Sequence, residues 1–482
     1  MTEEKTLKQK TASGLFWGTV NSFLTQLLSL AIGIILGRLL SPAEYGLIGM
    51  LAIFSAIAGT LQESGFRAAL TNLKDVSHRE YNAVFWFSTS VSLSLYVILF
   101  FCAPLIADFY HQPELIGLSR LTFASFVAAG IGTAHSAYMF RNMMNKEKAV
   151  VGFVSLSVSG VAGIVLALLG YSYWSLAWQT FIFILTCDIM TLYYVRWLPT
   201  LPVDFTPIKK MFGFSSKILL TNIINQVNNN ILSLIFGRLY SSQDVGNYTQ
   251  ASKWNVMGHS LITGSIGQVA QPVLVSVTEK GNRQINIFRK MLRFVSFVSM
   301  PAMLGLSLIA DFVPLLLGEQ WNNAVILLRI LCISGAFMPI HSLYQNLFIS
   351  NGRSDTYMWC TLAQVVLQIT VVLGFSGSGI NIMVTAYTIM IILWLAVLQL
   401  LARRMTGLRT SYVIKDVMPF LLVTLFSIGV AWYLTGNIVN AWLSIILRII
   451  ITTILYLGIL RLLGARILAE CLQFIAKRGD TQ

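Results

Sequence analysis

Charge is scarce in this sequence. Charged residues make up 11% of the 482 residues, whereas hydrophobic residues make up 56% and the mean hydropathy is +0.73. A soluble domain carries about a quarter charged residues, so an ordinary water-exposed surface is excluded. The segments Leu15–Gly37, Tyr81–Ala107 and Val417–Leu447 contain no charged residue, and each is long enough to cross a bilayer. The sequence therefore indicates an integral membrane protein.

Signatures of metal, disulfide and enzyme chemistry are also missing. The cysteines are odd in number, scattered and without CxxC spacing, which favours small core residues. There is no GxSxG, HExxH or P-loop motif, so we expect neither an enzyme nor an ATP-driven pump, and no cofactor or metal. The ten-residue alternation of a membrane β-barrel is not visible. The first apolar run exceeds a cleavable signal, so we interpret it as a permanent helix.

Apolar runs bounded by turns and charges predict an all-α fold with about fourteen transmembrane helices. Two uncharged runs are too long for one span, and each is interpreted as a hairpin, with turns at 170–173 and 374–379. The eighth span is unusually polar. The predicted spans are 14–38, 44–64, 82–106, 117–139, 149–169, 174–195, 213–238, 246–271, 291–317, 325–349, 357–376, 380–402, 415–435 and 441–462.

The distribution of basic residues orients these spans. Most of the 33 basic residues fall in alternate loops, together with both ends of the chain, whereas the opposite loops are short and acidic. By the positive-inside rule both termini are cytoplasmic. Membrane insertion and anionic lipid account for the net charge of +14, so no nucleic-acid partner is expected.

An internal repeat organises the first twelve spans. Residues 37–41 (GRLLS) with Gly46 recur as 237–241 (GRLYS) with Gly246, and 106–109 (IADF) recur as 309–312. Because each repeat holds six helices, the halves are parallel repeats that we expect to form two facing lobes around a central cleft. We predict an N-terminal lobe at 1–200, a C-terminal lobe at 201–404, and two added helices with a cytoplasmic tail at 405–482. Such an architecture suits alternating access by rocking of the lobes.

Polar residues recur inside the first, seventh and eighth spans. Spacings of i, i+3, i+4 and i+7 place four amides of the seventh span on one helix face. Interhelical hydrogen bonding is the alternative, but a stripe of this length favours the lining of a cavity that binds substrate. The candidate residues are Gln26, Asn222, Asn225, Gln226, Asn229, Asn255 and His259.

Five basic residues lie in or beside spans, away from the cytoplasmic clusters: Arg38, Arg120, Arg238, Lys253 and Arg329. Arginine forks and a lysine ammonium suit a phosphate or diphosphate headgroup. The arginines at span ends have an alternative role, snorkelling to lipid headgroups. Arg120 and Arg329 have another, ion pairing with Asp108 and Glu319. A substrate-binding role is favoured most for Lys253, which lies seven residues inside its helix.

Asp188 in the sixth span is the most isolated intramembrane carboxylate. Coupling to a proton or sodium ion is one interpretation, but an ion pair with Arg196 or with a neighbouring helix is favoured. His135 and His341 occupy equivalent positions in the two repeats, which favours a packing or hydrogen-bonding role.

Four motifs resemble the polysaccharide-transporter branch of the multidrug/oligosaccharidyl-lipid/polysaccharide exporter superfamily. They are GLFWG at 14–18, GRLLSPAEYG at 37–46, ESGFRAAL at 63–70 and APLIADFY at 103–110. This branch includes Wzx-type O-antigen, colanic acid and teichuronic acid exporters. The resemblance covers essentially the whole chain. It implies two six-helix lobes forming a V, with two extra C-terminal helices.

The function implied by this resemblance is flipping of an undecaprenyl-pyrophosphate-linked oligosaccharide across the bacterial inner membrane. The implied site is a cationic cavity with a lateral opening for the lipid tail. A polysaccharide polymerase and glycosyltransferases are further partners that the resemblance suggests, beside membrane lipids. A multidrug/cation antiporter of the same superfamily is the main alternative, although it requires acidic lumen residues. A polymerase or ligase and a scaffold for the synthesis complex are weaker alternatives.

Overall fold

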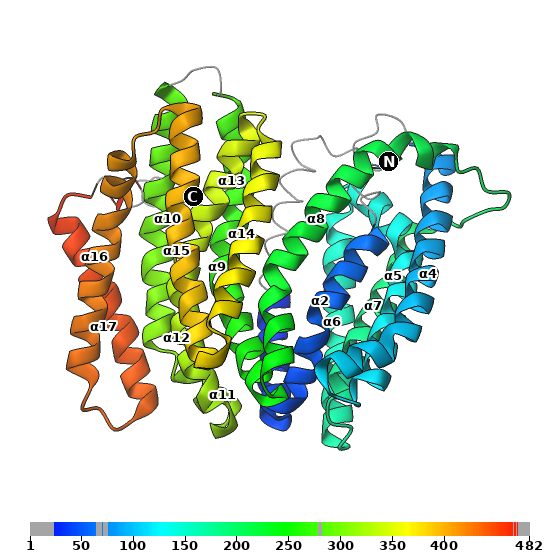
Figure 1. Ribbon diagram of the computed structural model, residues 1–482, viewed down its shortest axis with the longest axis horizontal. Coiled ribbons are helices and arrows are strands. Elements are labelled where there is room, and N and C mark those ends of the chain that lie inside the picture. The colour runs from blue at the N-terminus through cyan, green and yellow to red at the C-terminus, as the bar shows by residue number, and fades with distance from the viewer. Residues whose placement is uncertain are drawn as a thin grey trace, which may run out of the picture. The chain divides into compact units, whose positions relative to one another are not determined.

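The computed structural model describes residues 24–63, 70, 76–277, 282–465, 467–468 and 470 (Figure 1). Over these residues the chain forms helices joined by turns and short loops, without a strand. The beginning of the first predicted span, the 14–18 motif, most of the 63–70 motif and the C-terminal tail lie outside the described residues. The all-α fold class is confirmed.

The chain packs as two compact units, Met1–Gly246 and Asn247–Gln482. In the first unit α8 packs against α2 and α4. The lobe boundary at residue 200 comes from the sequence repeat and stays a prediction. The helices of the first unit are Leu24–Leu39, α2 (Pro42–Glu63), α4 (His78–Tyr110), α5 (Leu115–Arg141), α6 (Asn145–Leu168), α7 (Trp174–Val195) and α8 (Thr206–Leu239).

The second unit continues α9, which begins in the first unit. Here α10 packs against α12, α16 and α17, and α15 packs against α12 and α14 (Figure 1). Its elements are α9 (Ser242–Val275), α10 (Asn282–Leu308), α11 (Phe312–Leu317), η2 (Glu319–Trp321), α12 (Asn322–Gly335), α13 (Met338–Ser350), α14 (Ser354–Gly374), η3 (Ser376–Ser378), α15 (Ile380–Thr406), α16 (Thr410–Thr435) and α17 (Ala441–Leu462).

Eleven helical segments of the described chain are long and apolar enough to cross a membrane, with η2, α12 and α13 counted as one. The protein is therefore a multi-pass membrane protein. Three further predicted spans overlap helices outside this set: the shorter apolar helix Leu24–Leu39, α8 and α9. The last two have 34 residues each, so their polarity and not their length sets them apart.

Residues at positive φ lie in the turns of both predicted hairpins, α6–α7 and α14–α15. The first hairpin turns through Gly170 and Ser172, both at positive φ, and the second through Gly379 at φ 90°. Glycine adopts this left-handed region without a Cβ clash. Both predicted hairpins are confirmed.

The starts of α2 and α9 share one local design. The Ser41 hydroxyl accepts the Glu44 amide at 3.4 Å, and the Ser241 hydroxyl accepts the Asp244 amide at 3.2 Å. Such side-chain caps satisfy amides that the first helical turn leaves unpaired. The two caps lie 200 positions apart, as the repeat requires.

The same two helix starts cross at a pair of glycines. A Cβ added at Gly46 would overlap the Ser242 carbonyl oxygen, and one added at Gly246 would overlap the Pro42 carbonyl oxygen. All four residues belong to the first unit. Only glycine permits so close an approach of two backbones.

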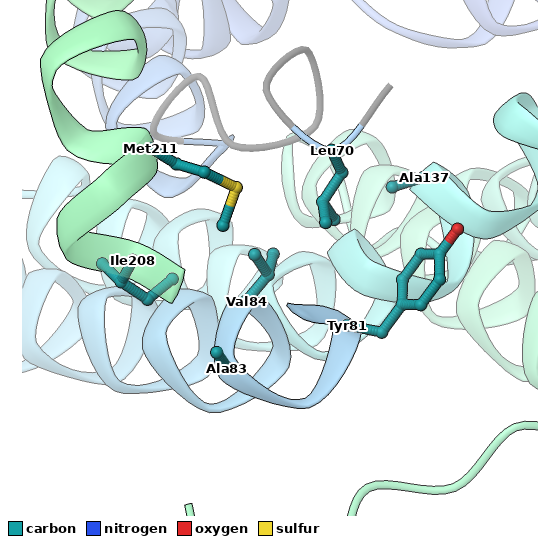
Figure 2. Packing of buried hydrophobic residues seen from close by; sticks show 7 residues of the cluster. All are labelled: Leu70, Tyr81, Ala83, Val84, Ala137, Ile208 and Met211. Atoms are coloured by element: carbon teal, nitrogen blue, oxygen red, sulfur yellow. The ribbon is translucent and has the colours of Figure 1, made fainter. Parts of the chain in front are cut away.

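A buried cluster fixes the start of α8 in the first unit. Figure 2 shows seven residues, with Tyr81, Ala83 and Val84 from α4 and Ile208 and Met211 from α8. The loop before α8 is held as well, because Asn82 exchanges two 2.9 Å hydrogen bonds with the Thr200 backbone. The orientation of α8 is thus set by its first turns.

Within the second unit, ion pairs join α16 and α17 to the segments of α10 and α11 near both ends of the helix pair. Asp416 of α16 accepts Arg289 Nε at 2.6 Å and Nη2 at 3.2 Å, with Arg293 Nε at 3.7 Å. Arg448 of α17 lies 3.3 Å from Asp311. The added helices are therefore docked by charge as well as by apolar contact.

Candidate functional site

One side of α8 carries four amide side chains, Asn222, Asn225, Gln226 and Asn229. We call this side the amide face. Asn222 and Asn229 are exposed, and the two residues between them are half-buried. Exposed amides at this density cannot face hydrocarbon, because lipid offers no hydrogen-bond partners. In a membrane-spanning α8, this face would therefore require a wet cavity or another polar surface beside it. Its predicted alignment on one side of the helix is consistent with this exposure.

Gln26 lies in the helix Leu24–Leu39 of the same unit and is half-buried. No hydrogen bond joins its side chain to another described residue. Its amide is therefore free among the described residues. No hydrogen bond of the described residues links Gln26 to the amide face.

The candidates of α9 separate into two faces. Lys253 is exposed, and no described carboxylate pairs with its ammonium group. Asn255 is only 6% exposed, and a Cβ added at Gly335 of α12 would overlap its Oδ1. His259 is half-buried, with Nδ1 buried and unpartnered among the described residues. Positions two apart point about 200° apart on a helix, so Asn255 packs inward while Lys253 faces outward.

Arg120 lies against α4. Its guanidinium lies 4.1 Å from the centre of the Phe100 ring, and its Nε donates to the Phe100 carbonyl oxygen at 3.5 Å. The alternative of an ion pair with Asp108 is wrong, because no described carboxylate pairs with Arg120. Cation–π contact holds the side chain in place.

Arg329 forms a bidentate ion pair with Asp311, through Nη2 at 2.7 and 2.8 Å from the two carboxylate oxygens. The alternative prediction of an ion pair between Arg329 and Glu319 is therefore wrong. Sequence distance misled here, because Asp311 lies in the turn before α11 and reaches α12 only in the folded unit. A second arginine shares the same carboxylate: Arg448.

Arg448 was missed at the sequence level. It lies within the predicted span 441–462, and a charge inside an otherwise apolar span was the available signal. Its side chain is 14% exposed. Nε donates to Thr435 Oγ1 at 3.1 Å, and Nη1 donates to the Leu308 carbonyl at 3.2 Å.

The two arginines at helix ends are both exposed. Arg238 closes α8, where it contacts His111 and lies 5.6 Å from the Phe109 ring centre. Arg38 lies near the end of its helix and has a partner of its own. Both positions remain compatible with lipid-headgroup contact and with a ligand.

Asp188 of α7 has no ion pair with any described residue. Its Oδ2 is buried without a hydrogen-bond partner, and a Cβ added at Gly132 of α5 would overlap Oδ1. The favoured pair with Arg196 is wrong: that arginine is exposed and caps the end of α7 at φ 49°. Asp188 is thus a carboxylate packed against a glycine.

The two histidines are structural, as predicted. His135 Nε2 lies 3.0 Å from the Trp197 carbonyl oxygen, and His341 Nε2 lies 3.1 Å from the Ile391 carbonyl oxygen. Both side chains are buried. His135 satisfies a backbone acceptor in the loop after α7, and His341 satisfies one on α15.

The described residues form eleven helical segments apolar enough to cross a membrane, beside the two long and more polar helices α8 and α9, which defines a multi-pass helical membrane protein. Residues 35–326, more than half of the chain, match the family described as polysaccharide biosynthesis protein. The chain belongs to this family. The predicted resemblance to the polysaccharide-transporter branch of the multidrug/oligosaccharidyl-lipid/polysaccharide exporter superfamily is confirmed.

Relatives and solved structures agree with this assignment. Lipopolysaccharide biosynthesis protein WzxC of Escherichia coli is 25% identical over 77% of each chain. Teichuronic acid biosynthesis protein TuaB of Bacillus subtilis is 24% identical over 72% of this chain and 73% of its own. The lipid II flippase MurJ, in an inward closed conformation, superposes with a TM-score of 0.75 over 92% of this chain and 99% of its own, at 15% identity. The last likeness is one of fold.

Proposed function

We propose that this protein flips an undecaprenyl-pyrophosphate-linked oligosaccharide across the bacterial inner membrane for surface polysaccharide synthesis. Family membership supports the saccharide pathway, and the fold shared with a lipid II flippase supports a lipid-linked cargo. The observation that carries the proposal is the amide face of α8, since sugars need many neutral hydrogen-bonding groups and lipid needs none. The protein acts as a transporter and not as an enzyme.

The architecture proposed with this function has fourteen spans. They form parallel repeats at 1–200 and 201–404, followed by the helices of 405–482, with both termini cytoplasmic. Support comes from the equivalent caps at Ser41 and Ser241 and from the glycine pair Gly46 and Gly246, each 200 positions apart. Alternating exposure of the amide face to the two sides of the membrane moves the headgroup.

Lys253 supplies the positive charge for the pyrophosphate. Lys253 is an exposed residue without an ion pair among the described residues, whereas Arg329 shares Asp311 with Arg448. An uncommitted cation gains the full benefit of binding a phosphate group. Asp188, also without an ion pair, is the proposed coupling site for a proton.

A deletion strain tests the function. Loss of surface polysaccharide with accumulation of lipid-linked repeat units is expected, and normal polymer without the intermediate contradicts the proposal. Complementation with Lys253→Gln should restore less than a tenth of export, because a charge-assisted contact to phosphate is lost. The matched control is Lys290→Gln, which removes a lysine from an exposed pair with Glu470.

A second candidate function is multidrug/cation antiport, favoured by the unpaired carboxylate of Asp188. It predicts drug sensitivity of the deletion strain with intact surface polysaccharide. The reverse pattern, intact drug resistance with lost polysaccharide, supports the flippase.

A further inference from the structure

An apolar groove lies between α10 and α17 in the second unit. Its volume is about 480 Å³, within the range of small-molecule sites. The lining includes Phe297, Gly305 and Leu306 from α10 and Ile449 and Leu457 from α17. Such a surface suits an acyl chain.

One end of this groove is charged. Arg448 is the only charged residue in the lining of the groove, and it belongs to a cluster of two arginines and one aspartate with a net charge of +1. Its Nε and Nη1 bind protein acceptors, whereas Nη2 has no acceptor in the described chain. A guanidinium with donors left over binds a phosphate oxygen readily.

A second polar group lies one turn away. Thr452 lines the groove at i+4 from Arg448, is 6% exposed, and has an Oγ1 without a hydrogen-bond partner among the described residues. Unsatisfied buried hydroxyls are rare in native proteins. Within the described chain, Arg448 thus offers a free donor at the edge of an apolar channel, and the unsatisfied Thr452 hydroxyl lies one turn away, where a small side-chain rotation would bring it to a ligand.

A second groove provides the comparison. It lies between α14 and α15, has about 390 Å³, and is lined by residues such as Leu367, Ala386 and Leu393, with no charged residue. The two grooves are thus similar in volume and in the apolar character of their linings. Charge distinguishes them.

We infer that the groove between α10 and α17 binds an anionic phospholipid, with the phosphate at Arg448 and Thr452 and one acyl chain against α10. The ligand bridges the added helix α17 to α10. Charge complementarity selects an anionic headgroup over a zwitterionic one. This site is separate from the proposed translocation surface and does not depend on it.

The test is lipid retention by the full-length protein. The protein is reconstituted in nanodiscs of equal phosphatidylglycerol and phosphatidylcholine, re-extracted in detergent, and its bound lipid is counted by mass spectrometry. Wild type should retain phosphatidylglycerol over phosphatidylcholine by about fivefold, because the net charge of +1 favours an anionic headgroup, whereas choline offsets the phosphate charge. Arg448→Gln should bring the ratio close to one.

Arg448 also docks α17, so a second variant leaves it in place. A Cβ at Gly305 meets nothing within 4 Å, and Gly305 lines the groove, so Gly305→Leu adds a side chain that occupies the groove. Its expected result is loss of retained lipid with a folded protein, whereas Ala386→Leu in the uncharged groove leaves retention unchanged. Equal retention of both lipids by wild type, or full retention by Gly305→Leu, overturns the inference. The inference is also overturned if undecaprenyl phosphate, added at the same mole fraction as phosphatidylglycerol, displaces the retained phosphatidylglycerol. The groove would then bind the lipid tail of the substrate.

Discussion

Asp188 and Asp416 are both carboxylates on helices apolar enough to cross a membrane, and their surroundings in the two units differ. Asp416 is 4% exposed and is matched by Arg289 and Arg293, so its charge is compensated. Asp188 has only the backbone of Gly132 against Oδ1 and no partner for Oδ2 among the described residues. A buried charge needs either a counter-charge or a proton. The pair thus distinguishes a docking carboxylate from one free to exchange a proton.

The largest effect on stability is expected at the compensated carboxylate. Asp416→Asn leaves Arg289 and Arg293 without their counter-charge at the contact of α10 with α16. Because these arginines are partly exposed, we expect a loss of about 2 kcal/mol, below the roughly 3–5 kcal/mol of a fully buried pair. Thermal unfolding in detergent measures it. Lys290→Gln, in an exposed pair, should change stability by less than about 1 kcal/mol, and equal losses would contradict the distinction.

A smaller loss is expected from crowding the uncompensated carboxylate. Gly132→Ala places a methyl group where Asp188 Oδ1 lies, so we expect destabilisation of about 1–2 kcal/mol. The double variant Gly132→Ala with Asp188→Ala should recover most of it, because the overlapping oxygen is gone. Additive losses in the double-mutant cycle would show that the two residues do not meet.

Removing the charge of Asp188 should cost little stability but change transport. Asp188→Asn keeps the shape and discards an unpaired ionisable group, so stability should change by less than about 1 kcal/mol. The response of flipping to a proton gradient in proteoliposomes should disappear. If Asp188→Asn keeps the wild-type response to the proton gradient, Asp188 does not couple protons to flipping.

The smallest effect belongs to a third carboxylate, outside the membrane. Hydrogen bonds from Thr206 and the nearby Arg79 lower the pKa of the exposed Asp204 to about 2. Since the folded pKa lies below the unfolded 3.8, the stabilisation is present above pH 4 and is lost as pH falls through 2. Asp204→Asn should lower the melting temperature slightly at pH 7 and leave it unchanged below pH 2, so that the fall in melting temperature between pH 4 and pH 2 is shallower than in the wild type. A large loss at pH 7 would contradict this reading of an exposed pair.

Sequence periodicity predicted the helices well, because hydropathy and turn residues are local properties. The hairpin turns around Gly170 and Gly379 and the common exposure of Asn222 and Asn229 follow from spacing alone. On α9, the spacing of Lys253 and Asn255 already separates their faces.

Charge partners could not be predicted in the same way. Arg329 pairs with Asp311 rather than Glu319, and Asp188 pairs with neither Arg196 nor another described base. Pairing depends on the depth and rotation of helices that are distant in sequence, and hydropathy fixes neither. The role of Arg448 required the position of α17 beside α10.

The central claim is that the amide face of α8 contacts a lipid-linked oligosaccharide during its passage, and that the charge of Lys253 is needed for that passage. The most direct measurement is a leaflet-resolved flipping assay in proteoliposomes with an undecaprenyl-pyrophosphate-linked oligosaccharide. Wild type should flip it, and Lys253→Gln and the pair Asn222→Leu with Asn229→Leu should each slow flipping at least about tenfold, with Lys290→Gln at the wild-type rate. Wild-type flipping by both test variants would contradict the account.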